Sequence, residues 1–214
     1  QVFFKSMKYV SLMAFPIAII TLVFAPDFMN VAYGRKWLEA VVPLQWLTVY
    51  GLVHYIAVNM GSVFKAGGKP KWLLYIAAVR LTVMAALLYP VIVARGIVGV
   101  AMLSAVVAVV DFFLSLFLTN RLVRAPWQSY AKMLIPMLLS AIACTLVGHQ
   151  VYKWIWTQIH PFVSLPLTGG LALLLYLGVM YAYDPDVRLV AGQVLNGVLR
   201  EFRRARVVRE QTRA

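Results

Sequence analysis

Six long, nearly uninterrupted apolar stretches constrain this chain more than any other feature of its sequence. A helix needs about 20 predominantly apolar residues to cross the hydrocarbon core of a bilayer. Stretches of that length occupy residues 9–28, 41–64, 72–93, 97–120, 133–152 and 165–183. Inside lipid, the backbone must satisfy its own hydrogen bonds, so only helices and closed barrels span a membrane. The stretches are continuous and do not alternate polar with apolar residues as barrel strands do, which predicts six transmembrane helices.

The composition supports the same fold class. Hydrophobic residues make up 63% of the chain and charged residues 13%, whereas soluble domains are about half apolar and a quarter charged. The single cysteine, Cys144, lies inside an apolar stretch, which excludes a disulfide scaffold. We therefore expect an all-α integral membrane protein. Because the sequence begins at Gln1 and not at Met, we also expect it to be part of a longer polypeptide.

The basic residues fall mainly in alternate connections. The chain has 20 Lys and Arg against 7 acids, a net charge of +13. Arg80 lies inside a stretch, and only four basic residues lie in the first, third and fifth connections: Arg35, Lys36, Arg95 and Lys153. The remainder flank the other ends of the stretches, a distribution that follows the positive-inside rule and predicts cytoplasmic N- and C-termini. It explains the net charge without a nucleic-acid partner.

The last segment, residues 184–214, follows the sixth stretch. Asp184 and Pro185 form an N-cap and a first helical residue, and apolar residues then recur at helical spacing among many arginines. We interpret this segment as a basic amphipathic helix on the cytoplasmic face, in contact with anionic headgroups. A solvated charged tail is the alternative.

Motifs of enzymes are missing. The sequence contains no HExxH, CxxC or GxSxG motif. Residues 65–70 resemble a phosphate-binding loop but lack its first glycine and its Ser or Thr, so we interpret them as a tight turn. The pair Asp184 and Asp186 resembles a metal-binding acid pair but fits a helix cap better. We expect no catalytic residues, no metal site and no cofactor.

Ionisable residues inside the apolar stretches are the main candidates for function, because charge in the bilayer centre is costly. At about 1.5 Å per residue, Arg80 lies about 12 Å and Asp111 about 13 Å from the same end of their stretches. This matching depth predicts an ion pair or a shared water-filled cavity. The alternative is that the pair only joins two helices. His54, at about 15 Å, is a weaker candidate.

Several sequence segments together resemble one family. They are Phe15-Pro16 through Pro26-Asp27, Gly34-Arg35-Lys36-Trp37-Leu38-x-Ala40-Val41, Pro43-Leu44-Gln45-x-Leu47, residues 61–70 and Gly96-Ile97-Val98-Gly99-Val100-Ala101. The chain is similar over about residues 1–125 to the multidrug/oligosaccharidyl-lipid/polysaccharide exporter superfamily. Within it, the similarity is to the lipopolysaccharide, O-antigen and exopolysaccharide flippases.

The resemblance implies a carrier of 12–14 helices in two lobes, of which this chain is the C-terminal portion and the missing N-terminal lobe is a partner. Such proteins of the bacterial inner membrane move an undecaprenyl-diphosphate-linked oligosaccharide to the outer leaflet by alternating access. Arg80 would face the diphosphate, because its planar guanidinium can bind two phosphate oxygens. Asp111 would orient Arg80 or take a proton. Lys65, with the neighbouring Lys69 and Lys71, would either receive the diphosphate or only set the topology.

Three other functions are weighed against the flippase. A drug/cation antiporter of the same superfamily would favour acids in its cavity, and this chain has one acid deep inside a stretch, Asp111. A membrane-embedded polysaccharide polymerase or glycosyltransferase would need a large outer loop, whereas the outer connections here are short. A membrane scaffold would not need Arg80 and Asp111. We therefore expect a transporter and not an enzyme.

Overall fold

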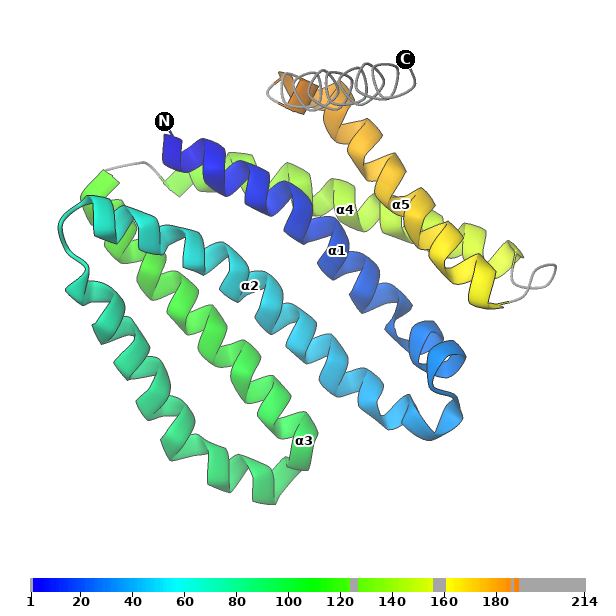
Figure 1. Ribbon diagram of the computed structural model, residues 1–214, viewed down its shortest axis with the longest axis horizontal. Coiled ribbons are helices and arrows are strands. Elements are labelled where there is room, and N and C mark those ends of the chain that lie inside the picture. Colours follow the sequence, from blue (N-terminus) through cyan, green and yellow to red (C-terminus); the bar gives the residue numbers. More distant parts are fainter. Residues whose placement is uncertain (1, 124–126, 156–160, 186, 189–214) are drawn as a thin grey trace, which may run out of the picture.

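The computed structural model describes residues 2–123, 127–155, 161–185 and 187–188, and these residues are almost entirely helical (Figure 1). The elements are α1 (Val2–Ala32), the short 3-10 helix η1 (Arg35–Ala40), α2 (Val41–Ala66), α3 (Lys71–Val123), α4 (Trp127–Ile155) and α5 (Pro161–Tyr183). The all-α fold class predicted from the apolar stretches is confirmed. Each predicted stretch lies within one of these helices, and two of them lie within α3.

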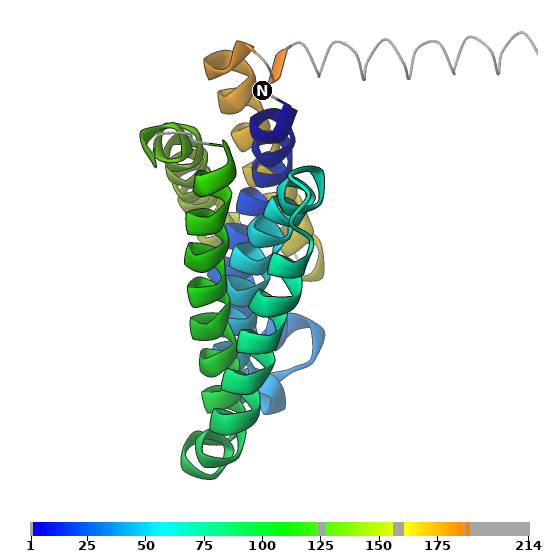
Figure 2. The ribbon, with the colours of Figure 1, turned by 90° about the vertical axis from the view of Figure 1, so that its left-hand side faces the viewer.

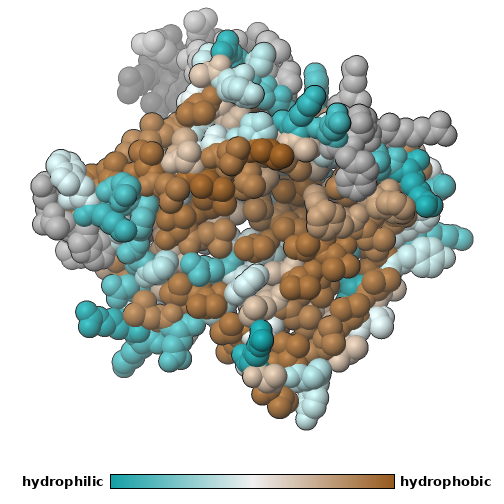
Figure 3. Space-filling view, turned by 180° about the vertical axis from the view of Figure 1, so that it is seen from behind, coloured by the Kyte–Doolittle hydropathy of each residue, from teal (hydrophilic) through white to brown (hydrophobic). Residues whose placement is uncertain are grey.

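Five of the helices are long and apolar enough to cross a membrane. Their outward faces carry many exposed apolar side chains, among them Leu81, Tyr89 and Ile97, which are 71%, 78% and 79% exposed. Figure 3 shows apolar residues covering a broad central area of one face, with hydrophilic residues gathered toward its margins. A soluble protein rarely exposes apolar patches of this extent. The chain is therefore a multi-pass membrane protein.

Helix α3 is folded back on itself at Gly96. With 53 residues it would be about 80 Å long if it were straight, more than twice the thickness of a hydrocarbon core. Gly96 has φ 57° and ψ −144°, a conformation that only glycine adopts readily. The chain reverses there, so residues 71–95 and 97–123 form two antiparallel arms (Figure 1). The hydropathy pattern predicted two helices here, and the structure has two helical arms joined by a non-helical bend at Gly96.

The helices pack side by side as a bundle (Figures 1 and 2). Helix α2 contacts both α3 and α1, while α1 also contacts α4 and α5, which contact each other. The core between α1, α2, α4 and α5 contains large side chains such as Met7, Met60 and Tyr176. Close approach between α4 and α5 depends on a small residue, because a Cβ atom at Gly148 would lie 2.8 Å from that of Ala172.

The chain reversals place most of the basic residues of the described segments at one end of the bundle. This basic end comprises the start of α1, the α2–α3 connection, the end of α3, the start of α4 and the end of α5 (Figure 1). Its basic residues are Lys5, Lys8, Lys65, Lys69, Lys71, Arg121, Lys132 and Arg188. At the start of the predicted amphipathic tail, the Arg188 amide donates to the Asp184 carbonyl oxygen at 3.3 Å. The rest of that tail, residues 189–214, lies outside the described residues.

Candidate functional site

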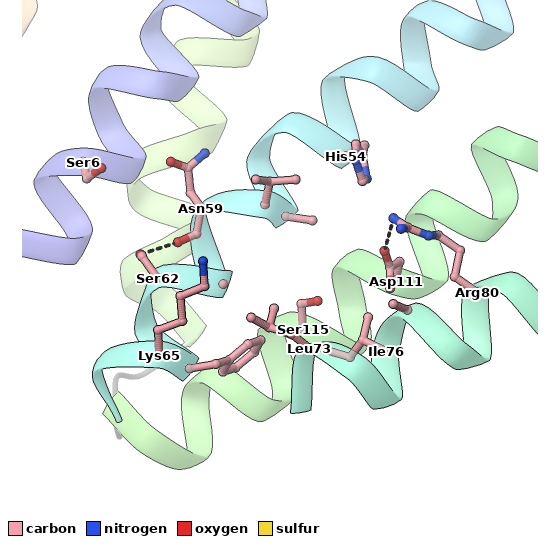
Figure 4. A pocket seen from close by; sticks show the side chains of 15 residues that line it. Ser6, His54, Asn59, Ser62, Lys65, Leu73, Ile76, Arg80, Asp111 and Ser115 are labelled. Atoms are coloured by element: carbon pink, nitrogen blue, oxygen red, sulfur yellow. Dashed lines mark hydrogen bonds and ion pairs between the residues drawn. The ribbon is translucent and has the colours of Figure 1, made fainter. Parts of the chain in front are cut away.

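A cavity of about 580 Å³ lies between α1, α2 and the two arms of α3. Its walls bring together all four residues that the sequence nominated. His54 and Lys65 come from α2, Arg80 from the first arm of α3, and Asp111 from the second (Figure 4). Lys65 is in the last turn of α2 at the basic end. Arg80 is nine residues after the start of α3, which places it about 13 Å deeper in the bundle.

Arg80 and Asp111 form an ion pair inside this cavity. Arg80 Nη1 lies 3.5 Å from Asp111 Oδ2, so the contact predicted from their matching depth is present. The bend at Gly96 explains it, because Arg80 lies sixteen residues before the bend and Asp111 fifteen residues after it. The Asp111 side chain is 9% exposed and that of Arg80 is 37% exposed. The carboxylate is therefore held by the protein, while the guanidinium extends into the cavity.

The guanidinium of Arg80 is not saturated by this contact. Among the described residues, Asp111 is the one polar partner of Arg80, through a single pair of atoms. A guanidinium has five N–H donors arranged in a planar fork. The remaining donors are available to water or to an anionic group in the cavity that Arg80 lines. If Arg80 served only to join two helices, more of its N–H groups would be expected to donate to Asp111.

His54 lies on the α2 wall, and its ring faces the ion pair (Figure 4). The ring stacks on Tyr50, one helical turn earlier, with centroids 5.3 Å apart and planes at 8°. Its Nδ1 atom is buried and has no hydrogen-bond partner among the described residues. The stacking fixes the orientation of the imidazole on the cavity wall.

Lys65 is exposed at the basic end of the cavity. Its two neighbours in the sequence cluster do not line the cavity: Lys69 instead lies over the Trp72 ring at 4.7 Å, and Lys71 begins α3. Of the three lysines, the structure therefore places only Lys65 in the cavity lining, a distinction that the sequence alone did not provide. Asn59 and Ser62, also on this wall, donate to backbone carbonyls of their own helix at 2.8 and 2.7 Å.

The charges that line the cavity are unequal. Lys65 and Arg80 contribute two positive charges and Asp111 one negative charge, before any charge on His54. A low-dielectric cavity with an excess of one sign of charge concentrates ions of the opposite sign. Groups of three or more metal-ligating side chains are absent from the described residues. The excess of positive charge in the lining suits an anion.

Two ion pairs of the described residues lie outside this cavity, and neither was predicted from the sequence. Lys8 Nζ donates to Asp184 Oδ1 at 2.7 Å and lies 2.6 Å from Asp184 Oδ2, which connects α1 to the segment after α5. His149 Nδ1 lies 3.9 Å from Asp27 Oδ2, between α4 and α1. The partners are far apart in sequence, and neither pair shares a motif, so their contacts depend entirely on how the helices pack.

Comparison with known proteins gives two distant relatives. The chain is 25% identical over 149 residues to the teichuronic acid biosynthesis protein TuaB of Bacillus subtilis strain 168, covering 70% of this chain and 31% of that protein. It is 29% identical over 115 residues to an uncharacterized membrane protein in the cps region of Klebsiella pneumoniae, covering 54% of this chain and 24% of that protein. No family model matches, and no solved structure matches.

The chain thus spans about a quarter to a third of the length of these relatives. The Klebsiella match agrees with the structure on the membrane location, since that relative is described as a membrane protein and the bundle described here has five helices of spanning length. The chain is a multi-pass membrane protein that is distantly related to a polysaccharide biosynthesis protein.

Proposed function

We propose that this chain is part of a flippase, a transporter that moves a lipid-linked oligosaccharide across the bacterial inner membrane by alternating access. The cargo is a precursor of a surface polysaccharide, carried on undecaprenyl diphosphate. The single observation that carries the proposal is Arg80, an incompletely paired guanidinium in a large cavity between membrane helices. The name of the Bacillus relative, which refers to biosynthesis of a polysaccharide, supports the choice of cargo.

In this proposal both arms of α3 cross the membrane, which gives six crossings and places the basic end in the cytoplasm. The positive-inside rule supports that orientation, because the described basic residues concentrate at this end. The chain covers only part of its relatives, so the proposal pairs it with a second lobe in the same polypeptide. The resulting carrier would have 12–14 helices.

The cavity residues have separate roles in the proposed cycle. Lys65 attracts the diphosphate at the cytoplasmic mouth, and Arg80 binds it deeper in the cavity through two parallel N–H donors. Asp111 holds the guanidinium in place when no cargo is bound. As the diphosphate arrives, it competes with Asp111 for Arg80, so loading the cargo weakens a contact between the two arms of α3. His54 contributes a polar contact on the opposite wall.

The test is export of surface glycan in a bacterium that lacks its own flippase but supplies the matching glycan pathway. The strain is complemented with the complete gene, either wild type or carrying Arg80→Ala. Arg95→Ala is the matched control, because Arg95 is on the same helix but outside the cavity, where it contacts Met102 Sδ at 3.9 Å. Membrane levels of each protein are measured in parallel.

Wild type and Arg95→Ala are expected to restore export, and Arg80→Ala to lose at least tenfold, corresponding to about 1.4 kcal/mol of lost binding to the charged group. Near-normal export by Arg80→Ala at normal membrane levels would remove Arg80 from the site. Failure of a well-expressed wild type to restore export would contradict the flippase function itself.

A further inference from the structure

A second cleft, of about 340 Å³, lies at the basic end of the bundle and is separate from the Arg80 cavity. Its walls come from the start of α1, the start of α4 and the end of α5, three segments that are widely separated in sequence. None of its lining residues also lines the Arg80 cavity. The inference drawn from this cleft does not depend on the proposed transport function.

The rim of the cleft is basic. Lys5 on α1 and Lys132 on α4 are both exposed and face it from two different helices. Lys8 also lines the cleft, and its charge is balanced by the ion pair with Asp184, in which the two side chains are 16% and 13% exposed. Lys5 and Lys132 therefore leave two positive charges at the rim that Asp184 does not balance.

The floor of the cleft is apolar. Met133, Met137 and Met180 line it, and the last two are almost fully buried. Met137 lies five residues after Lys132 on the same helix, about 7 Å farther along the axis from the basic end. Methionine side chains are flexible and adapt to apolar groups of different shapes. Tyr183, which also lines the cleft, is of a type enriched at the level of lipid headgroups.

This succession of charge and apolar surface matches the two parts of a phospholipid. Two cations lie where a membrane helix leaves the bilayer, and on α4 the methionines extend from Met133, next to Lys132, to Met137, about one and a half turns toward the centre of the bilayer. A free anion such as phosphate would use the lysines but would gain nothing from the apolar floor. Basic clefts between membrane helices are a known form of anionic headgroup site.

We propose that the cleft between α1, α4 and α5 binds one anionic phospholipid from the leaflet at the basic end. The headgroup phosphate contacts Lys5 and Lys132, and the upper part of an acyl chain lies along Met133, Met137 and Met180. The ion pair of Lys8 with Asp184 closes one side of the site and keeps its net charge at two. The bound lipid joins α1 to α4 and α5 at this end of the bundle.

The test measures binding of phosphatidylglycerol and phosphatidylcholine to the purified complete protein in detergent by native mass spectrometry. The variant Lys5→Gln/Lys132→Gln removes both rim charges. The control Lys69→Gln/Lys71→Gln removes the same charge from the α2–α3 connection at the same end, outside the cleft. Every variant retains the arginines after residue 188, so their contribution stays constant.

The rim variant is expected to bind phosphatidylglycerol about 30-fold more weakly than wild type, since each lysine close to an anionic lipid contributes about fivefold. The control pair is expected to bind it as wild type does, and phosphatidylcholine binding is expected to change in neither variant. Asp184→Asn shifts the charge in the opposite direction by releasing Lys8, and is expected to tighten phosphatidylglycerol binding about fivefold.

Three results would overturn the proposal. Equal losses in the rim and control variants would show that the lipid responds only to overall charge. Unchanged binding in the rim variant would show that the cleft is not the site. Displacement of phosphatidylglycerol by inorganic phosphate at comparable concentration would show that the apolar floor contributes nothing and that the cleft is a simple anion site.

Discussion

Asp111 is the more deeply buried member of its ion pair with Arg80. Because of this difference in burial, replacing Arg80 is expected to affect the stability of the protein as well as its proposed transport function. Its side chain is 9% exposed, while that of Arg80 is 37% exposed. Replacing Arg80 alone leaves a buried carboxylate without its cation. Breaking a fully buried pair costs about 3–5 kcal/mol, and the partial exposure of Arg80 reduces the expected cost here to about 1–3 kcal/mol. A loss of export in the Arg80 single variant would therefore be caused in part by lower protein stability.

A double substitution removes this ambiguity. We expect Arg80→Met/Asp111→Leu to be at least as stable as Arg80→Met, because replacing both members of an ion pair by apolar residues is often neutral or stabilising. Export is still expected to be lost, since no guanidinium remains to bind the diphosphate. Thermal unfolding in detergent gives the stability, and glycan export in the complemented strain gives the function. Export at the wild-type level in the double variant would mean that the pair only joins the two arms.

At the scale of elements, Gly96 is the residue on which the site depends without being part of it. Its positive φ lets α3 reverse, and that reversal brings Arg80 beside Asp111. A Cβ atom at Gly96 would have nothing within 4 Å, so any cost of adding one comes from the backbone and not from crowding.

Gly96→Ala is therefore expected to destabilise the protein by about 1–3 kcal/mol, the cost of holding a non-glycine residue in such a conformation. Gly51→Ala is the matched control, because Gly51 lies within α2 and a Cβ there also has nothing within 4 Å. In a regular helix that change should stabilise by up to about 1 kcal/mol. Unfolding by heat in detergent measures both. A Gly96→Ala protein that is as stable as the Gly51→Ala protein would show that the bend does not require glycine.

The long helices could be predicted from the sequence. Contacts between helices could be predicted only where two consecutive apolar stretches fold back on each other. Hydropathy located every long helix of the described residues, because burial in lipid demands long apolar segments, but it did not predict the short 3-10 helix η1. The Arg80–Asp111 contact was also predictable, since the two stretches are consecutive and depth along a helix follows from residue number. The Lys8–Asp184 and Asp27–His149 contacts were not. They join segments whose relative placement depends on the packing of the whole bundle, about which local sequence carries little information.

At the scale of the whole molecule, α3 decides how many times the chain crosses the membrane. Its two arms are each about 37–40 Å long, enough to span a hydrocarbon core of about 30 Å. If both arms cross, Gly96 lies on the side of the membrane opposite the α2–α3 connection. If the hairpin instead lay outside the bilayer, the exposed apolar side chains along its first arm, such as Leu74 and Tyr89, would have to be covered by protein.

Cysteine labelling in intact cells distinguishes the two arrangements. The single native thiol, Cys144, is buried and is first replaced by Ala to give a silent background. An impermeant maleimide is expected to label Arg95→Cys and Lys36→Cys from outside, and to label Lys69→Cys only after the membrane is permeabilised. Because Lys69 precedes the first arm of α3 and Arg95 ends it, opposite accessibility at these two positions requires that the first arm crosses the bilayer. Labelling of Arg95→Cys only after permeabilisation, with Lys36→Cys still accessible, would contradict six crossings. It would also move the Arg80 cavity out of the transport path, because its walls would no longer lie within the bilayer.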